Sequence, residues 1–401
     1  MPGSRDLEPK SAGEERARSR PELEEEAAAS FFTQPRRIAQ TLLIVLILVA
    51  AIYVLLPKIV GLEDALATLD QGDPVWIALA VAFNILAFAS YVALFRGVVG
   101  ERVLHLEWRE SYQITMAGLA ATRLFSAGGA GGIILTYWAL RKAGMERRQS
   151  ACRMVAFLVL LYAVYLAALV LFGVLLRAGV LPGRAPIGLT IVPAALAGAV
   201  ILVFLLIALI PEDFERRLAR FTQGYRFQRV ARRIATAPAT LASGTRTAIA
   251  FVRSPRRGGL AVIGAVGFWA ANIAILWASF EAFGVEPSLG VLVQGFFVGM
   301  VANLLPFAPG GVGAVDAGMI GAFVLFGLPS AEVFAAVLVY RLIAFWLPIP
   351  PGIVAFLQLR RTAARWDEAR EQGALPAGAP AAAAANPGTG RRDRTSKSKV
   401  I

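Results

Sequence analysis

The stretch Asn303-Leu-Leu-Pro-Phe-Ala-Pro-Gly-Gly-Val-Gly-Ala-Val-Asp316 decides how this chain folds. It separates two apolar runs, at about 287–305 and 312–327. Four helix-breaking residues lie between them: Pro306, Pro309, Gly310 and Gly311. Proline removes an amide donor and glycine destabilises a helix, so we expect no continuous helix here. Hydrocarbon tolerates such a break only where protein or a water-filled cavity covers the freed polar groups, as in transporter substrate sites. The alternative is an ordinary membrane span with a kink.

The composition is that of a polytopic membrane protein. The 401 residues are 57% hydrophobic and 17% charged, whereas soluble domains are about 45–50% apolar and about 25% charged. Several apolar runs approach or exceed the roughly 20 residues that cross a bilayer. The net charge of +13 would suit a nucleic-acid partner, but the arginines lie beside apolar runs, as the positive-inside rule requires. We therefore expect membrane lipids, and no nucleic acid, as partners.

Charged loops divide the chain into a membrane domain, residues 36–360, and two tails. Six spans are predicted in this domain, at about 38–56, 74–98, 150–176, 187–210, 259–281 and 331–358. Residues 1–35 and 361–401 are expected to be disordered cytoplasmic tails, the second of them basic. Residues 211–258, with eleven arginines, are expected to be a cytoplasmic linker that contains an amphipathic helix. That helix would rest on anionic lipid or be exposed to solvent.

Two further segments, at about 111–140 and 287–327, have both ends on one side of the membrane. We predict that each is a re-entrant helical hairpin, the first entering from the cytoplasm and the second from outside. The first contains its own break, Ser126-Ala-Gly-Gly-Ala-Gly-Gly132. The order span–hairpin–span thus occurs twice in opposite orientation, as in the inverted repeats of secondary transporters. The predicted fold is all-α, with about six spans and two re-entrant hairpins in an inverted repeat.

Each break precedes a new half-helix whose unpaired amides and dipole suit an anion. Glycine also lets a lipid head group approach the backbone. The alternative is close packing of helices through small residues. The candidate substrate-binding residues of the breaks are Ser126, Gly128, Gly129, Asn303, Pro309, Gly310 and Gly311.

A charged pair is expected near the middle of the membrane. Arg341 lies ten residues into the last predicted span, and a central arginine costs about 2.5–3.5 kcal/mol on insertion scales, so it normally faces a cavity or a partner. Asp316, one turn into the second half-helix, is the expected partner. We expect Arg341 to engage a lipid phosphate while Asp316 holds or releases it; the alternative is a structural ion pair. Arg123 is the matching candidate in the first hairpin, and Tyr137 and Tyr340 complete the candidate site, unless they only pack.

Several classes of chemistry lack the residues that they need. No Walker loop is present, so ATP hydrolysis is not expected. Cys152 is the only cysteine and His105 the only histidine, which leaves no set for a metal centre or a Ser-His-Asp triad at membrane depth. We therefore expect no catalytic residue, no metal and no cofactor.

The second break and the last span resemble the flippase-like transmembrane domain of bacterial lysylphosphatidylglycerol synthases. The resemblance rests on Pro309-Gly-Gly-Val-Gly-Ala-Val-Asp316, on Tyr340-Arg341 and on Trp346-Leu-Pro348, and covers about 36–360. The first hairpin departs from the family pattern because it has no acidic residue at its glycines. In the full-length synthases a soluble aminoacyltransferase domain follows, whereas about forty low-complexity residues follow here. The resemblance therefore implies a stand-alone relative without that domain.

The resemblance implies that the protein moves lipids between leaflets without ATP hydrolysis. The lipid would be an anionic or modified phospholipid, or a lipid-linked glycan, and the location would be the bacterial inner membrane with both termini cytoplasmic. We expect a transporter and not an enzyme. The alternative is an accessory subunit that presents lipid to a separate lipid-modifying enzyme, and an intramembrane enzyme is a third interpretation. The oligomeric state is left open.

Overall fold

The computed structural model describes residues 71–100, 104, 106–124, 130–209, 228–301 and 313–372, without the side chains of 130 and 228–237. All these residues belong to one unit of the chain, residues 51–401. The regular structure of the described residues is entirely helical. In chain order the elements are α4 (Pro74–Val99), α5 (Trp108–Leu124), α6 (Ala130–Lys142), α7 (Arg147–Arg177), the 3₁₀ turn η2 (Ile187–Leu189), α8 (Ile191–Ala208), α10 (Gln228–Arg253), α11 (Pro255–Glu281), α12 (Leu289–Val301), α13 (Ala314–Leu325), α14 (Ser330–Arg341), the π-turn η5 (Leu342–Trp346) and α15 (Ile349–Glu371). The predicted N-terminal tail, the predicted first span, residues 125–129 of the first glycine-rich break and residues 302–312 at the second lie outside the described residues.

Five helical segments of the described chain are long and apolar enough to cross a membrane. They are α4, α7, η2 with α8, α11, and α14 continued through η5 into α15. These five match the predicted spans that begin at 74, 150, 187, 259 and 331. In α8, Leu196 is 64% exposed and Leu202 and Leu206 are each 56% exposed. A row of exposed leucines suits hydrocarbon and not water, so the chain is a multi-pass membrane protein.

Helices α4 and α11 cross in close contact at two glycines. A Cβ atom on Gly97 would lie 2.7 Å from the Cα atom of Ala261 and overlap its backbone nitrogen. A Cβ atom on Gly264 would likewise lie 2.7 Å from the Cα atom of Leu94. The contacts are reciprocal: Gly97 of α4 faces Ala261, three residues before Gly264, and Gly264 of α11 faces Leu94, three residues before Gly97. Such a reciprocal crossing is compatible with the predicted inverted repeat, which stays a prediction.

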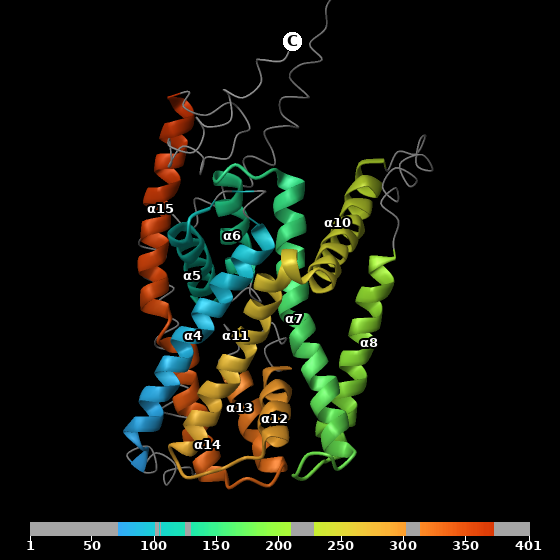
Figure 1. The fold of residues 1–401 in the computed structure, drawn as a ribbon, viewed down its shortest axis with the longest axis vertical. Coiled ribbons are helices and arrows are strands. Elements are labelled where there is room, and N and C mark those ends of the chain that lie inside the picture. Colours follow the sequence, from blue (N-terminus) through green and yellow to red (C-terminus); the bar gives the residue numbers. More distant parts are fainter. Residues whose placement is uncertain are drawn as a thin grey trace, which may run out of the picture. The chain divides into compact units, whose positions relative to one another are not determined.

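Two pairs of short helices correspond to the predicted hairpins. The helices α5, α6, α12 and α13 have 17, 13, 13 and 12 residues, fewer than a membrane span needs. Within each pair the helices pack on one another, and Gly132 of α6 lies so close to α5 that a Cβ atom would overlap the hydroxyl of Thr122. Figure 1 shows α5 and α6 toward the N-terminal end of α7, and α12 and α13 toward its C-terminal end. The helical pairs are present, and their re-entrance into the membrane stays a prediction.

The last helix is longer than the sequence suggests. α15 continues to Glu371, so the first part of the predicted C-terminal tail is helical. This segment is rich in Ala, Arg and Glu, which favour helix, and it buries Thr362, Ala363 and Trp366, while α15 packs on α5.

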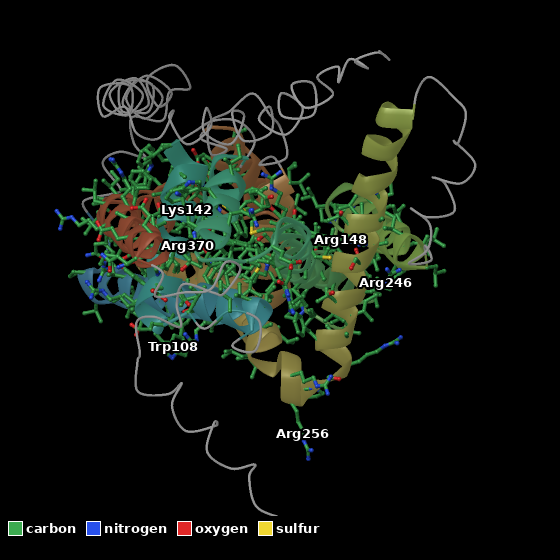
Figure 2. All side chains as sticks on the ribbon, turned by 90° about the horizontal axis from the view of Figure 1, so that it is seen from above. Trp108, Lys142, Arg148, Arg246, Arg256 and Arg370 are labelled. Carbon is green, nitrogen blue, oxygen red and sulfur yellow. The ribbon has the colours of Figure 1, made fainter. Side chains whose placement is uncertain are left out.

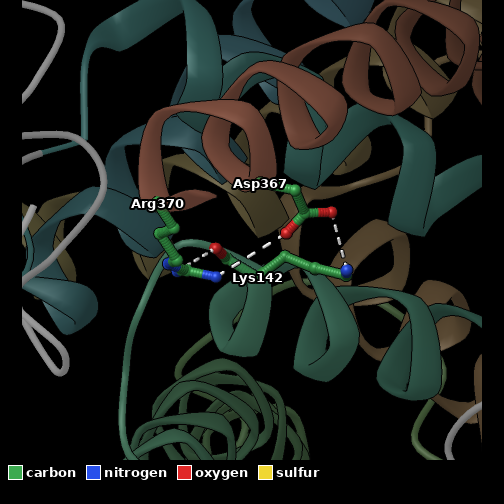
Figure 3. Close-up of polar contacts among 3 residues, drawn as sticks. All are labelled: Lys142, Asp367 and Arg370. Atoms are coloured by element: carbon green, nitrogen blue, oxygen red, sulfur yellow. Dashed lines mark hydrogen bonds and ion pairs between the residues drawn. The ribbon is translucent and has the colours of Figure 1, made fainter. Parts of the chain in front are cut away.

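The C-terminal end of α15 is fastened to the end of α6 (Figures 2 and 3). Lys142 Nζ of α6 lies 2.8 Å from Asp367 Oδ2, and Arg370 Nη2 donates a hydrogen bond of 2.5 Å to the Lys142 carbonyl. Earlier in α15, Thr362 Oγ1 donates to Gln113 Oε1 of α5 at 3.0 Å. The first helical pair and the last helix are therefore joined by polar contacts as well as by packing.

A helix is present in the basic linker as α10, and its described C-terminal half rests on protein, whereas the side chains of 228–237 lie outside the described residues. Its described half packs against α7, α8 and α11. Ala239, Ala242 and Ala248 are buried there, and Gly244 lies against Val155 of α7. The sequence analysis considered lipid or solvent as the surroundings of this helix, because hydropathy alone does not reveal a neighbouring span.

We predict the orientation of the chain in the membrane, which cysteine labelling can measure. After Cys152→Ser, single cysteines replace exposed residues in or next to four connections. Val180→Cys and Pro329→Cys should react with an impermeant maleimide from outside, whereas Glu146→Cys and Arg256→Cys should react only from the cytoplasmic side. Reaction of Glu146→Cys from outside would refute the predicted entry of the first hairpin.

Candidate functional site

The predicted ion pair between the second hairpin and the last span is formed. Arg341 Nε lies 2.5 Å from Asp316 Oδ1. Arg341, the last residue of α14, is 5% exposed, and Asp316, the third residue of α13, is 6% exposed. A carboxylate and a guanidinium are thus both removed from solvent, and each is the counter-ion of the other. The pairing is confirmed, whereas the role of the pair stays a prediction.

Asp316 is held in place by the start of its own helix. Gly313 precedes α13 with φ of 79°, a left-handed conformation that favours glycine. The Gly313 amide donates to Asp316 Oδ2 at 2.9 Å, so this oxygen caps the helix N-terminus. The spacing Gly-x-x-Asp therefore leaves one carboxylate oxygen for the cap and directs the other to Arg341.

Beyond Arg341 the last span changes its hydrogen-bond pattern. The backbone makes a π-turn, in which the Leu347 amide donates to the Leu342 carbonyl at 2.9 Å. Because the Leu347 amide bonds there, it does not satisfy the Ile343 carbonyl. Pro348 follows, and without an amide proton it leaves the Ala344 carbonyl without its helical donor. The turn therefore leaves the buried carbonyl oxygens of Ile343 and Ala344 free to accept hydrogen bonds from other parts of the chain.

Side chains from two other helices bond these carbonyl groups. Asn84 of α4 donates from Nδ2 to the Ile343 carbonyl at 2.9 Å. Arg123 of α5 donates from Nη2 to the Ala344 carbonyl at 2.8 Å and from Nη1 to the Phe345 carbonyl at 2.9 Å. Three successive carbonyls of η5 are thus bound by the first half of the chain.

Two guanidinium groups gather about one aromatic ring. The guanidinium carbon of Arg341 lies 4.4 Å from the Phe345 ring centroid, and that of Arg123 lies 5.3 Å from it. Such cation–π contacts stabilise partly desolvated cations. We call Arg123, Asp316 and Arg341 the charged site. With two cations and one carboxylate, the charged site carries a net positive charge.

The charged site retains donors for a further acceptor. Arg341 Nη2 of this site and Trp346 Nε1, whose ring centroid lies 5.0 Å from that of Phe345, are buried and have no hydrogen-bond partner among the described residues. An unsatisfied buried donor costs about 1–3 kcal/mol, so such groups normally receive a partner. An oxygen-rich anion such as a phosphate would supply acceptors and balance the net charge.

The remaining predicted site residues fall into two groups. Tyr340 is buried and packs edge-to-face on Phe296 of α12, with ring centroids 5.8 Å apart, and Tyr137 lies partly buried in α6. The residues of the glycine-rich breaks, Ser126, Gly128, Gly129, Asn303, Pro309, Gly310 and Gly311, lie outside the described residues, so their role stays a prediction. Along the chain, the first break follows Leu124 directly and the second ends just before Gly313.

The sequence analysis did not place Asn84, Phe345 and the η5 carbonyls at this site. For one of these carbonyls a signal was present in Pro348, which has no amide proton to donate to the Ala344 carbonyl. No local signal indicates which side chain would bond them, because Asn84 and Arg123 lie more than two hundred residues away in the chain.

Comparison with known proteins agrees with these features. A model of the family described as lysylphosphatidylglycerol synthase TM region matches residues 27–352, which include the charged site and both helical pairs. Three relatives from Methanothermobacter thermautotrophicus (strain Delta H) each carry the name UPF0104 membrane protein. One is 26% identical over 311 residues, which cover 73% of this chain and 87% of the relative. The other two are 34% and 32% identical over 86 and 90 residues, 21% and 22% of this chain and 26% of each relative. This chain belongs to the lysylphosphatidylglycerol synthase TM region family.

Proposed function

We propose that the protein moves lipids with an anionic head group between the leaflets of the inner membrane, as a flippase-like transporter that neither hydrolyses ATP nor acts as an enzyme. Both termini lie in the cytoplasm in this proposal, because the arginine-rich connections favour that orientation. The observation that carries the proposal is the charged site. Arg341 and Asp316 are buried, and Arg123 is partly buried, among membrane-spanning helices, where ionisable groups are costly and commonly serve substrate pathways.

The chemistry of the charged site suits reversible binding of a phosphate. The fork of a guanidinium matches phosphate oxygens, and such charge-assisted hydrogen bonds are among the strong ones. Without a lipid, Asp316 neutralises Arg341; with a lipid, the phosphate provides the second anion that the two arginines lack. Because the aspartate remains as a competing counter-ion, the head group is not trapped.

The arrangement of the helices suits access from two sides. Arg123 belongs to the first helical pair and Asp316 to the second, and these pairs lie toward opposite ends of α7 (Figure 1). Arg341 lies between them in the last span. A head group entering along either pair would therefore meet a charged residue of that pair and then Arg341.

We expect that neutralising the ion pair slows lipid movement at least about tenfold, since charged hydrogen bonds contribute about 1.5–3 kcal/mol each. The variant is Asp316→Asn with Arg341→Gln, which keeps an uncharged polar side chain at each position. Proteoliposomes receive fluorescent phospholipids with different head groups, and an impermeant reductant bleaches the outer leaflet. Bleaching beyond the outer-leaflet share measures translocation.

The matched control is Arg360→Ala, which removes an exposed arginine from the same last helix and should leave the rate unchanged. Bleaching that stops at the outer-leaflet share for every lipid with the unaltered protein would refute the proposal. A stoichiometric copurifying enzyme would then favour the accessory-subunit interpretation. Equal rates of lipid translocation for the neutral variant and the unaltered protein would show that the ion pair takes no part in lipid movement.

A further inference from the structure

A second site of different chemistry lies between α7, α11 and α12. It is a cavity of about 540 Å³, within the roughly 300–1,000 Å³ typical of small-molecule sites. Every lining residue is apolar or aromatic; those used below are Ala168, Trp269, Ala274, Val293 and Phe297. The indole nitrogen of Trp269 is already engaged, because it donates to the Leu161 carbonyl at 2.7 Å.

The cavity exists because a short helix packs beside two long ones. α7 and α11 have 31 and 27 residues, whereas α12 has 13. A half-length helix fills only part of the groove between two full spans, so the rest of the groove stays open beside it. A gap without partner atoms loses dispersion contacts along its walls, and an apolar gap is not filled well by water.

Aromatic packing gives the cavity a fixed wall. Tyr165, Trp269 and Phe297 contact one another, with ring centroids 4.8–5.6 Å apart. The Tyr165 hydroxyl also donates to the Phe297 carbonyl at 2.8 Å. Behind this wall, Phe296 contacts both Phe297 and Tyr340, the residue before Arg341. The wall therefore keeps the apolar cavity apart from the charged site.

The mouth of the cavity is continuous with the lipid-facing surface. Val266 and Leu289 line it and are 48% and 60% exposed, and Leu171, on the same helix as Ala168, is 55% exposed. In a multi-pass membrane protein such a surface is covered by hydrocarbon. The ligand available there is a flexible, unbranched hydrocarbon chain without polar groups.

We propose that this cavity binds one acyl chain of a membrane phospholipid, which completes the packing of α12 against α7 and α11. The inference goes beyond the proposed function, because it concerns a resident lipid and holds whether or not the protein moves lipids. The bound chain supports the second helical pair, whose α12 also contacts Tyr340 through Phe296.

The test uses the full chain in vesicles of phosphatidylethanolamine and phosphatidylglycerol that contain a phospholipid with a photoreactive diazirine in one acyl chain. The protein is transferred into detergent before irradiation, so loosely associated lipid is diluted away. Labelled peptides are then identified by mass spectrometry. We expect label on α7 near Ala168 and on α11 near Ala274, and far less on the exposed face of α8.

Ala274→Phe places a ring in the cavity and should reduce this labelling about tenfold or more, because the added volume excludes the chain. Ala168→Phe, on the opposite wall, provides a second variant if the first does not fold. The control is Ala199→Phe on the exposed face of α8, which should leave the labelling unchanged. Folding of each variant is checked by its elution volume in size-exclusion chromatography and by the midpoint of its thermal unfolding.

Equal labelling of α8 and of the cavity in the unaltered protein would mean annular lipid only and would overturn the inference. Undiminished labelling in both folded phenylalanine variants would overturn it as well. The outcome is separate from that of the transport experiment. If the protein retains cavity labelling but moves no lipid, this inference stands and the proposed function is refuted. If it moves lipid without cavity labelling, the proposed function stands and this inference is refuted.

Discussion

Asp316→Ala lowers the free energy of unfolding by about 3–5 kcal/mol, because it leaves a buried guanidinium without its counter-ion. Asp316 and Arg341 are both more than nine-tenths buried, and no second carboxylate lies within ion-pair distance of Arg341 in the described part of the chain. The substitution also removes the side-chain acceptor for the Gly313 amide, which contributes about 1 kcal/mol. The loss is measured by denaturant or thermal unfolding of the purified protein in mixed micelles.

A second ion pair of the same chain provides the control. Asp367 and Lys142 lie 2.8 Å apart, but their side chains are 38% and 37% exposed (Figure 3). Asp367→Ala should therefore cost no more than about 1 kcal/mol, as is usual for pairs in contact with solvent. The paired neutral variant Asp316→Asn with Arg341→Gln should recover most of the stability lost in Asp316→Ala, because no buried charge is left alone. Equal losses for Asp316→Ala and Asp367→Ala would show that the charged site is solvated.

Gly97→Ala should separate α4 from α11 and lower stability by about 3 kcal/mol, the upper part of the range for overpacking. The added methyl group meets the backbone of Ala261, which is unable to rotate away as a side chain would. Gly264→Ala should have a similar effect through Leu94. Thermal unfolding and the yield of monodisperse protein measure both.

Gly259→Ala is the matched control, since it lies on α11 as well but a Cβ atom there meets nothing within 4 Å. It should be neutral or slightly stabilising, because alanine favours helix more than glycine does. If Gly97→Ala proved as harmless as Gly259→Ala, the close crossing of α4 and α11 would be wrong.

The sequence predicted those features that have a local physical cause. The spans follow from runs of apolar residues, and the partner of Arg341 follows from the cost of an isolated charge in an apolar span. Asp316 was the carboxylate at a suitable depth, and the structure brings the two together. The family resemblance rested on the same residues and is confirmed by the match over residues 27–352.

Other features depend on tertiary contacts, so the local sequence did not predict them. α5 contains buried polar residues, among them Ser111, Gln113 and Thr115, so its environment is not visible in its hydropathy. Gln113 bonds Thr362, which lies in a segment predicted to be a disordered tail. A helix whose partners are remote in sequence resembles a polar loop or a tail until those partners are known.

The contacts of the first helical pair have a mechanical consequence. Arg123, at the inner end of α5, holds the turn η5, while Gln113 and Lys142, toward the outer ends of the same pair, hold α15. The pair is thus bonded to the last helix at two levels, and we expect the two to move together as one body. Asp316 contacts this body from the opposite pair through Arg341. Any rocking of the second pair against this body would therefore strain the Asp316–Arg341 salt bridge, together with the packing of Phe296 on Tyr340.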